Sequence, residues 1–325
     1  MDYAVQTKGI AREFGDVKAV DGIDLNISRG EIYGFLGPNG AGKTTLVRML
    51  ITLLLPTRGG ATVAGFDVVD QANDVRLRIG AALQEAALDP KQTGREILRL
   101  QGRLYGLSRR DVDTRFNELS SLVDIGDAID RFVGTYSGGM RRRLDLAASL
   151  IHNPEILFLD EPTTGLDPIS RARVWEEVRR INEEMDVTIF LTTQYLEEAD
   201  ALAGRVGIIN NGLLMAEGTP AELKRSLGKD VIIARVDGQA ELAREALVGL
   251  EVLDAVDVTG GEVIIQVTNG AAAISRVALA LNYVGVEVSE ITLRTPTLDD
   301  VFLSVAGERM DDAAEPDEVA AGAAD

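Results

Sequence analysis

The chain has 325 residues, of which 52 are acidic and 33 basic, so its formal net charge is −19. Its length predicts two domains, since a domain usually takes about 100–200 residues. The lack of cysteine excludes disulfide scaffolds and thiolate metal sites, the single histidine excludes a mechanism with two imidazoles, and the acidic balance argues against nucleic-acid binding.

Short strands are expected at the start of the chain. Apolar and polar side chains roughly alternate over residues 17–27, which favours half-buried strands in an antiparallel layer. A compact apolar run at Ile32–Leu36 predicts a buried strand, and a buried helix is expected after the glycines that follow it. A capping box at Thr93 and Glu96 then starts a mostly helical region that ends near residue 152.

Strand and helix alternate from residue 156 onward, which is typical of a parallel sheet with crossover helices. The expected elements are a strand at 156–159, a helix at 169–184, a strand at 187–193, a helix at 196–202, a hairpin at 205–214 and a helix at 219–227. The hairpin is predicted to turn at Asn211-Gly212, a pair that favours the type I′ turn.

The pattern changes after Gly228. Strands are expected at 231–236, 251–258, 262–268 and 286–294, with helices at 240–250 and 271–284. This β-α-β-β-α-β order is typical of a ferredoxin-like domain. A last helix is expected near Thr297, and the final residues predict a disordered tail, because they include seven acidic residues and one Arg. We therefore expect an N-terminal domain at 1–228, an accessory domain at 229–307 and the tail at 308–325.

A phosphate-binding loop is predicted between the strand at Ile32–Leu36 and the helix after it. The segment fits the pattern G-x-x-x-x-G-K-S/T, whose glycines let backbone N–H groups converge on an anion at a helix N-terminus. Lys43 is expected to contact the β- and γ-phosphates, and the Thr44 hydroxyl to ligate Mg²⁺. The residues expected to bind the nucleotide here are Gly37, Pro38, Asn39, Gly40, Ala41, Gly42, Lys43, Thr44 and Thr45.

Two carboxylates follow the buried strand at 156–159. Asp160 is expected to hold Mg²⁺ as the acidic partner of a phosphate loop. Glu161 stands one residue further, at the carboxyl end of the strand, where parallel sheets bind their ligands. From there it is expected to polarise the attacking water.

A second anion site is predicted at Ser137-Gly138-Gly139. Ser137 can cap a helix, and the two glycines expose backbone N–H groups. Three arginines follow at 141–143. The sequence leaves open whether they contact a phosphate or form a solvated helix face.

The order of these motifs resembles the nucleotide-binding subunit of an ABC transporter, and the resemblance covers residues 1–228. It implies an α/β fold: a P-loop NTPase of ABC type with an antiparallel β subdomain and a helical subdomain, beside a small C-terminal α+β ferredoxin-like domain. The amino-acid sequences of these motifs are similar to those of daunorubicin-resistance-type drug-exporter ATPases. The segments that carry the resemblance are Gly37–Thr45, Thr135–Arg143, Asp160-Glu161, Thr164–Asp167, Thr192–Asp200 and Leu298–Leu303.

The resemblance also implies roles for single residues. Phe14 would stack on adenine, and Gln84 would contact the Mg²⁺ and water site. The signature Ser137–Gly139 would act on the ATP bound to the other subunit of a homodimer. Asp167 would lie at the interface of that dimer.

One position departs from the family pattern. Most members have a switch histidine after the strand at 187–193, where this chain has Gln194. The only histidine, His152, precedes the carboxylate-bearing strand and cannot be the switch. Gln194 can donate a hydrogen bond to the γ-phosphate but carries no proton or charge for it. We expect it to act in catalysis with Lys43 and Glu161.

These features predict an ATPase subunit that binds ATP and Mg²⁺ and powers efflux of a hydrophobic drug or lipid-like compound. The longest apolar run, Met49–Leu55, is far shorter than the ~18 residues that span a bilayer, so the permease would be a separate integral membrane subunit. The ATPase would then work at the cytoplasmic face of the cell membrane.

Two other classes of protein remain as alternatives. The first is a non-transport ABC ATPase of the translation or DNA-repair kind, although such proteins carry tandem halves or long coiled-coil insertions. The second is a P-loop GTPase or small-molecule kinase, but the sequence has no Asn-Lys-x-Asp guanine reader.

Overall fold

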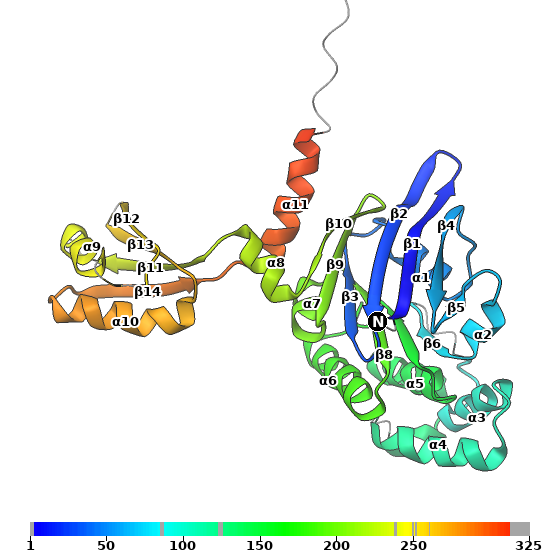
Figure 1. Ribbon diagram of the computed structural model, residues 1–325. Helices are drawn as coiled ribbons and strands as arrows, with labels where there is room; N and C mark the ends of the chain where they lie inside the picture. The colour runs from blue at the N-terminus through cyan, green and yellow to red at the C-terminus, as the bar shows by residue number, and fades with distance from the viewer. Residues whose placement is uncertain are drawn as a thin grey trace, which may run out of the picture. The chain divides into compact units, whose positions relative to one another are not determined.

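The computed structural model describes residues 3–84, 88–122, 126–236, 239–248, 250, 252–259 and 261–312. The chain divides into two compact units, Met1–Pro220 and Ala221–Asp325 (Figure 1). The division falls before the boundary predicted at residue 228. The segments with predicted phosphate chemistry all belong to the first unit.

An antiparallel sheet forms one layer of the first unit. Its strands lie in the order β2-β1-β4-β5, with bounds β1 (Tyr3–Phe14), β2 (Val17–Ser28), β4 (Arg58–Val63) and β5 (Phe66–Asp67). The antiparallel strands expected near the start of the chain are confirmed as the pair β1 and β2. Strands β4 and β5 come from residues for which the sequence predicts no element.

A six-stranded sheet forms the second layer, in the order β10-β9-β3-β8-β7-β6. The bounds are β3 (Ile32–Leu36), β6 (Ile79–Ala82), β7 (Ile156–Asp160), β8 (Thr188–Thr193), β9 (Arg205–Asn210) and β10 (Leu213–Gly218). All neighbouring pairs run parallel except β9 and β10, which form the expected hairpin. The carboxyl ends of β3, β7 and β8 therefore meet at one end of the sheet.

The helices of the first unit enclose two hydrophobic cores. Their bounds are α1 (Lys43–Leu50), α2 (Ala72–Arg76), α3 (Gly94–Leu104), α4 (Arg109–Leu122), α5 (Gly138–Leu150), α6 (Pro168–Met185) and α7 (Leu196–Leu202), with short 3₁₀ turns η1 (Gly126–Asp130) and η2 (Val133–Thr135). Phe158 and Phe190 pack with α1 and the antiparallel sheet, whereas Leu157 and Ile189 pack with α5 and α6. This alternation fixes the register of the central strands.

The second unit has its own core and its own antiparallel sheet, in the order β12-β13-β11-β14. Helix α8 (Pro220–Leu227) spans the division, and the elements after it are β11 (Asp230–Val236), α9 (Ala240–Val248), β12 (Ala255–Thr259), β13 (Glu262–Val267), α10 (Gly270–Tyr283), β14 (Val288–Arg294) and α11 (Leu298–Asp312). The predicted β-α-β-β-α-β order is confirmed. Helix α11 extends past the start of the predicted tail at residue 308, and residues 313–325 of that tail lie outside the described residues.

The described part of the chain contains no helix that combines the length and the apolar character needed to cross a membrane.

Candidate nucleotide site

The phosphate loop is packed too tightly for side chains at two of its glycines. It joins β3 to α1, and Gly42 is the N-terminal cap of that helix with a left-handed φ of +110°. A Cβ at Gly37 would lie 2.4 Å from the carbonyl oxygen of Ile209. A Cβ at Gly42 would lie 2.2 Å from that of Ala19. The first helical bond runs from Leu46 N to Gly42 O, so the N–H groups before it can face an anion.

Lys43 is buried and paired at the centre of this loop. Its Nζ donates to the carbonyl oxygens of Gly37 and Pro38 at 2.7 and 3.1 Å. The same atom lies 3.3 Å from Oε1 of Glu161, and the two side chains are 3% and 7% exposed. The loop is thus curled around its own lysine, whose charge stands where phosphate oxygens would bind.

Thr44 and Asp160 meet at the end of β7. Thr44 Oγ1 donates to Oδ1 of Asp160 at 3.3 Å, and Thr192 Oγ1 donates to the same oxygen at 2.5 Å. Asp160 is fully buried, so these hydroxyl groups fix its carboxylate. Hydroxyl and carboxylate oxygens suit Mg²⁺ when phosphate oxygens complete the shell. The residues present therefore fit the metal.

Glu161 has a left-handed backbone, with φ +49°. Its N–H donates to the carbonyl oxygen and to Oγ1 of Thr192, both at 3.1 Å. Its Oε2 accepts from Thr164 Oγ1 at 3.2 Å, while Oε1 faces Lys43. A left-handed glutamate costs on the order of 1–3 kcal/mol and persists where its surroundings hold it, as these contacts do.

The turn between β9 and β10 supports the phosphate loop. Gly212 N donates to Ala41 O at 3.0 Å, and Gly212 O accepts from Asp21 N at 2.8 Å. A Cβ at Gly212 would lie 2.9 Å from Lys18 O. Asn211 and Gly212 both have positive φ, +48° and +77°, as the predicted type I′ turn requires. The turn thus joins the phosphate loop to β2.

Ser137 and Asp167 are the N-terminal caps of α5 and α6. Ser137 Oγ accepts a backbone N–H of the first turn of α5 at 3.2 Å, and Asp167 Oδ1 accepts from Ser170 N at 3.0 Å. Ser170 Oγ also donates to Asp167 at 2.6 Å, and this bond lowers the pKa of the Asp167 carboxyl. A Cβ at Gly139 would lie 3.5 Å from Ser170 Oγ, so the two caps are neighbours. Gly138 lies beside the same segment, near Leu166.

Phe14 is the last residue of β1, Gln84 lies two residues past the end of β6, and both are exposed. Phe14 is 48% exposed, and the guanidinium of Arg12 stacks 4.6 Å from the centre of its ring. Gln84 directly precedes a gap in the described residues. Within the described ranges, no hydrogen bond joins the Gln84 side chain to the phosphate loop of the same chain.

Gln194 lies half-buried in the turn between β8 and α7. Tyr195 N donates to Thr193 Oγ1 at 2.9 Å, which holds this turn in place. Four residues after Gln194, the buried Glu198 accepts from Trp175 Nε1 at 2.9 Å. Burial raises the pKa of the Glu198 carboxyl. The turn that carries Gln194 is therefore anchored on both sides.

His152 lies at the other end of the sheet from the phosphate loop. Its Nε2 is 2.9 Å from the carbonyl oxygen of Ile79, which starts the parallel strand β6. Its ring stacks on Tyr105, with centroids 3.6 Å apart. Burial lowers the pKa of His152, which favours the neutral imidazole.

Arg142 has a place in this site that the sequence analysis did not recognise. Its guanidinium donates to the carbonyl oxygens of Leu83 and Ala82 at 2.7 and 3.2 Å. It also donates to Asp145 Oδ2 at 3.2 Å, and both side chains are largely buried. The Arg142 side chain therefore neither forms part of a solvated helix face nor serves as a phosphate contact. It ties α5, which carries Ser137, to the end of β6 that leads to Gln84.

This arrangement of a phosphate loop, a carboxylate-bearing strand end and two helix caps defines the first unit as an ATP-binding cassette of the P-loop NTPase class. The family model described as ABC transporter matches residues 20–164, and the model described as ATP-binding protein DrrA1-3-like, C-terminal domain, matches residues 218–306. The chain belongs to the DrrA-type family of ABC transporter ATP-binding proteins.

Two curated relatives match over nearly their whole length. "Daunorubicin resistance ATP-binding protein DrrA2" of Streptomyces coeruleorubidus is 49% identical, covering 95% of this chain and 97% of the relative. "Linearmycin resistance ATP-binding protein LnrL" of Bacillus subtilis (strain 168) is 34% identical, covering 95% and 100%. The solved structure of an ATP-binding subunit of an ABC transporter matches with a TM-score of 0.62 and 26% identity, over 69% of this chain and 93% of that one. The chain is thus an ABC transporter subunit that binds ATP and couples its hydrolysis to transport.

Proposed function

We propose that this ATPase subunit powers efflux of a hydrophobic drug or lipid-like compound. The support comes from relatives whose names state resistance to daunorubicin and linearmycin. The transport path would lie in a separate integral membrane permease. The ATPase would sit at the cytoplasmic face of the membrane, held there by that permease.

We propose that hydrolysis takes place where Lys43, Thr44, Asp160 and Glu161 converge, and this convergence is the observation that carries the mechanism. Lys43 would exchange its contact with Glu161 for the β- and γ-phosphates. Glu161, released from the lysine and still held by Thr164, would then orient and polarise the attacking water. Gln194 would donate a hydrogen bond to the γ-phosphate.

Mg²⁺ would be held by Thr44 and Asp160, with Gln84 reaching the same site. Among the described residues no cluster of three or more His, Asp or Glu side chains forms a metal site, so phosphate oxygens would complete the shell. When bound, the metal would neutralise charge that develops on the phosphates. The hydrogen bond from Thr192 keeps the Asp160 carboxylate in position for this contact.

The rest of the predicted site belongs to a homodimer in this proposal. Ser137, Gly138 and Gly139 would contact the ATP bound to the other subunit, and Asp167 would lie at the interface. Phe14 would stack on adenine with the ring face that Arg12 leaves open. Closing the dimer would require the cap at Ser137 to share its hydroxyl with a phosphate.

We also propose the finer organisation of the chain: a helical subdomain built on α3 and α4, and a nucleotide-binding domain at 1–228. The accessory domain at 229–307 would be ferredoxin-like, since its strand order agrees with that topology.

The proposed function is tested by expressing the chain with its permease in a drug-sensitive host and measuring drug accumulation. The wild-type pair should lower accumulation, and the pair with Glu161→Gln should not. Equal drug accumulation with the wild-type pair and with the Glu161→Gln pair would contradict efflux. Hydrolysis of MgATP by the purified chain, measured in parallel, separates a failed transporter from a failed ATPase.

A further inference from the structure

The second unit ends its sheet on a strand with an open edge. In the order β12-β13-β11-β14, strand β14 pairs with β11 on one side, and no described strand lies on its other side. Its seven residues contain no proline, and its pairing with β11 is irregular only between Val288 and Glu290, so the regular backbone at Glu290–Arg294 can accept another strand.

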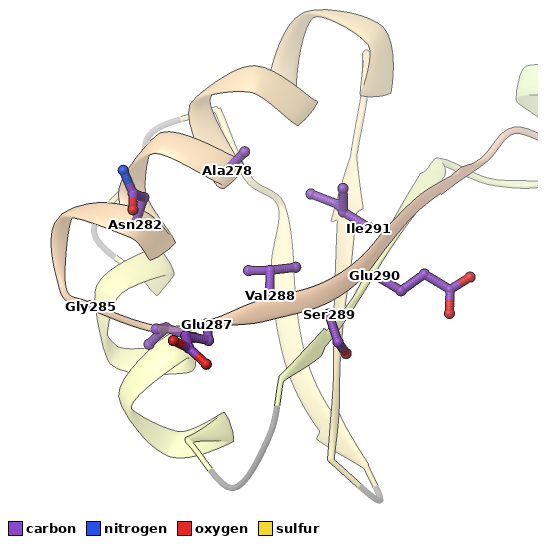
Figure 2. A pocket seen from close by; sticks show the side chains of 9 residues that line it. Ala278, Asn282, Gly285, Glu287, Val288, Ser289, Glu290 and Ile291 are labelled. Carbon is purple, nitrogen blue, oxygen red and sulfur yellow. The ribbon is translucent and has the colours of Figure 1, made fainter.

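A groove runs beside this edge, between α10 and β14 (Figure 2). Its volume is about 740 Å³, and its lining includes Ala278 and Asn282 from the helix and Val288 and Ile291 from the strand. Figure 2 shows Val288 and Ile291 on the side of β14 that faces the helix. An extended peptide along the edge could therefore place alternate side chains in the groove.

The helix beside the groove has an unusually apolar exposed face. Leu279 and Tyr283, one helical turn apart and next to the lining positions of α10, are 68% and 92% exposed. These side chains add exposed apolar surface beside the groove and the open strand edge, which a bound chain could cover.

The charge of the groove indicates which kind of partner could bind there. Glu287 and Glu290 line it, and the lining includes no Lys or Arg. Arg235 reaches Glu290 at 2.9 Å but is shared with Glu262 at 2.8 Å. Residues 229–307 include twelve acidic and five basic residues. The groove therefore favours a basic partner, and pairing with a second, equally acidic copy is disfavoured.

We propose that the edge of β14 and the groove beside it bind an extended, Lys- and Arg-rich cytoplasmic segment of the permease as an added strand. Main-chain hydrogen bonds along β14 would supply affinity, and the groove and its glutamates would supply specificity. Cytoplasmic segments of membrane proteins carry an excess of Lys and Arg, which gives the acidic groove a matching partner. The inference rests on the proposed function, because it requires a separate permease.

The test uses the full-length chain and three labelled peptides, followed by fluorescence anisotropy. The first alternates Lys and Val, the second alternates Glu and Val, and the third is the first peptide with every backbone nitrogen methylated. We expect saturable binding of the first, and binding weaker by about tenfold or more for the other two, since one lacks the charge and the other the main-chain donors.

Charge variants locate the binding. Glu287→Lys combined with Glu290→Lys should weaken binding of the Lys-Val peptide about tenfold. The control is Asp257→Lys, one exposed charge reversal on β12 at the opposite edge of the sheet, which is compared with Glu287→Lys and Glu290→Lys made singly and should leave binding unchanged. Equal melting temperatures of the variants would show that they fold alike.

Three results would overturn the proposal: no binding of the Lys-Val peptide, binding that survives methylation, or equal effects of the groove reversals and the Asp257 reversal. Self-association of the nucleotide-free chain that the peptide reverses would assign the edge to a second copy and also overturn it. ATPase activity measured on the same samples separates the two proposals. Activity without peptide binding refutes this inference alone, and binding without activity counts against the proposed function.

Discussion

The ammonium group of Lys43 lies 3.3 Å from the carboxylate of Glu161, and both side chains are more than nine-tenths buried. A buried charge without a partner is costly, so each of these residues stabilises the other. In the mechanism proposed above, a nucleotide that takes the lysine would also release the glutamate. One event would then fill the phosphate site and free the proposed base.

Lys43→Ala should abolish tight MgATP binding, because charge-assisted hydrogen bonds to phosphate contribute ~1.5–3 kcal/mol each. The melting temperature should also fall, since Glu161 loses its buried partner. Calorimetric titration with MgATP is the measurement, and Lys18→Ala, which removes an exposed lysine, is the control. Wild-type affinity in the Lys43 variant would refute the assignment of the loop.

Glu161→Gln should keep MgATP binding and lower the hydrolysis rate by ~10²–10⁴-fold, because the amide cannot accept the proton of water. The bound ATP should then hold the chain as a dimer on size-exclusion chromatography. Glu155→Gln, directly before the same strand, should hydrolyse ATP at the wild-type rate. If the Glu161 variant hydrolyses ATP at the wild-type rate, another residue polarises the water.

Gln194→Ala should lower the ATPase rate about 2- to 13-fold, the value of one neutral hydrogen bond of ~0.5–1.5 kcal/mol. Gln194→His should add a titration near pH ~6.5 to the ratio of variant to wild-type rate, since imidazolium is the stronger donor. Rates at saturating MgATP across pH measure both effects. A ratio independent of pH would show that residue 194 does not reach the γ-phosphate.

Arg142→Met should lower the free energy of unfolding by about 3–5 kcal/mol, because Asp145 is left buried without its partner. Arg142→Met combined with Asp145→Leu should recover part of that loss. Urea denaturation measures the stability. If the tie to β6 also positions Gln84, Arg142→Lys should be stable yet reduced in kcat. An Arg142→Met chain as stable as wild type would contradict the structural role.

Asp145 should make stability depend on pH. Burial raises the pKa of Asp145 from 3.8 to about 6, so the folded chain holds this proton more tightly than the unfolded chain. The stabilisation is complete below pH 3.8 and is lost as the pH rises to about 6. Between about pH 4 and 7, the unfolding free energy of wild type relative to Asp145→Asn should fall by about 2–3 kcal/mol. A constant difference would contradict the buried carboxyl.

Strand β7 and strand β4 show what local sequence can and cannot predict. The apolar run Ile156–Leu159, ending in two carboxylates, predicts a buried strand at a ligand-binding end. Strand β4 begins with Arg58-Gly59-Gly60, residues that disfavour strands. It forms because Gly59, with φ +69°, allows close approach to β1, where a Cβ would lie 2.1 Å from Gly9 O. The strand conformation of these residues is therefore set by pairing with β1 and not by their local sequence.

The residues of the candidate site also fall into those that the sequence could predict and those that it could not. The phosphate loop could be predicted, since its residues are contiguous and their spacing is tied to backbone geometry. Arg142 could not be singled out from three consecutive arginines, because its burial depends on the four-residue strand β6, which the sequence did not predict. The role proposed for Ser137 needs a second subunit, and in a single chain its hydroxyl caps α5.

The hairpin turn at Asn211-Gly212 bears on how this protein can be labelled. Surface turns are the usual place for an inserted epitope or fluorescent reporter, because loops tolerate insertions. Here the turn is hydrogen-bonded through Gly212 to Ala41 and Asp21, so an insertion would disconnect the phosphate loop from β2. A reporter fits better in the exposed turn between α3 and α4, provided that Gly106 itself is kept: the space around it is open to 4 Å, but its φ of +80° favours glycine.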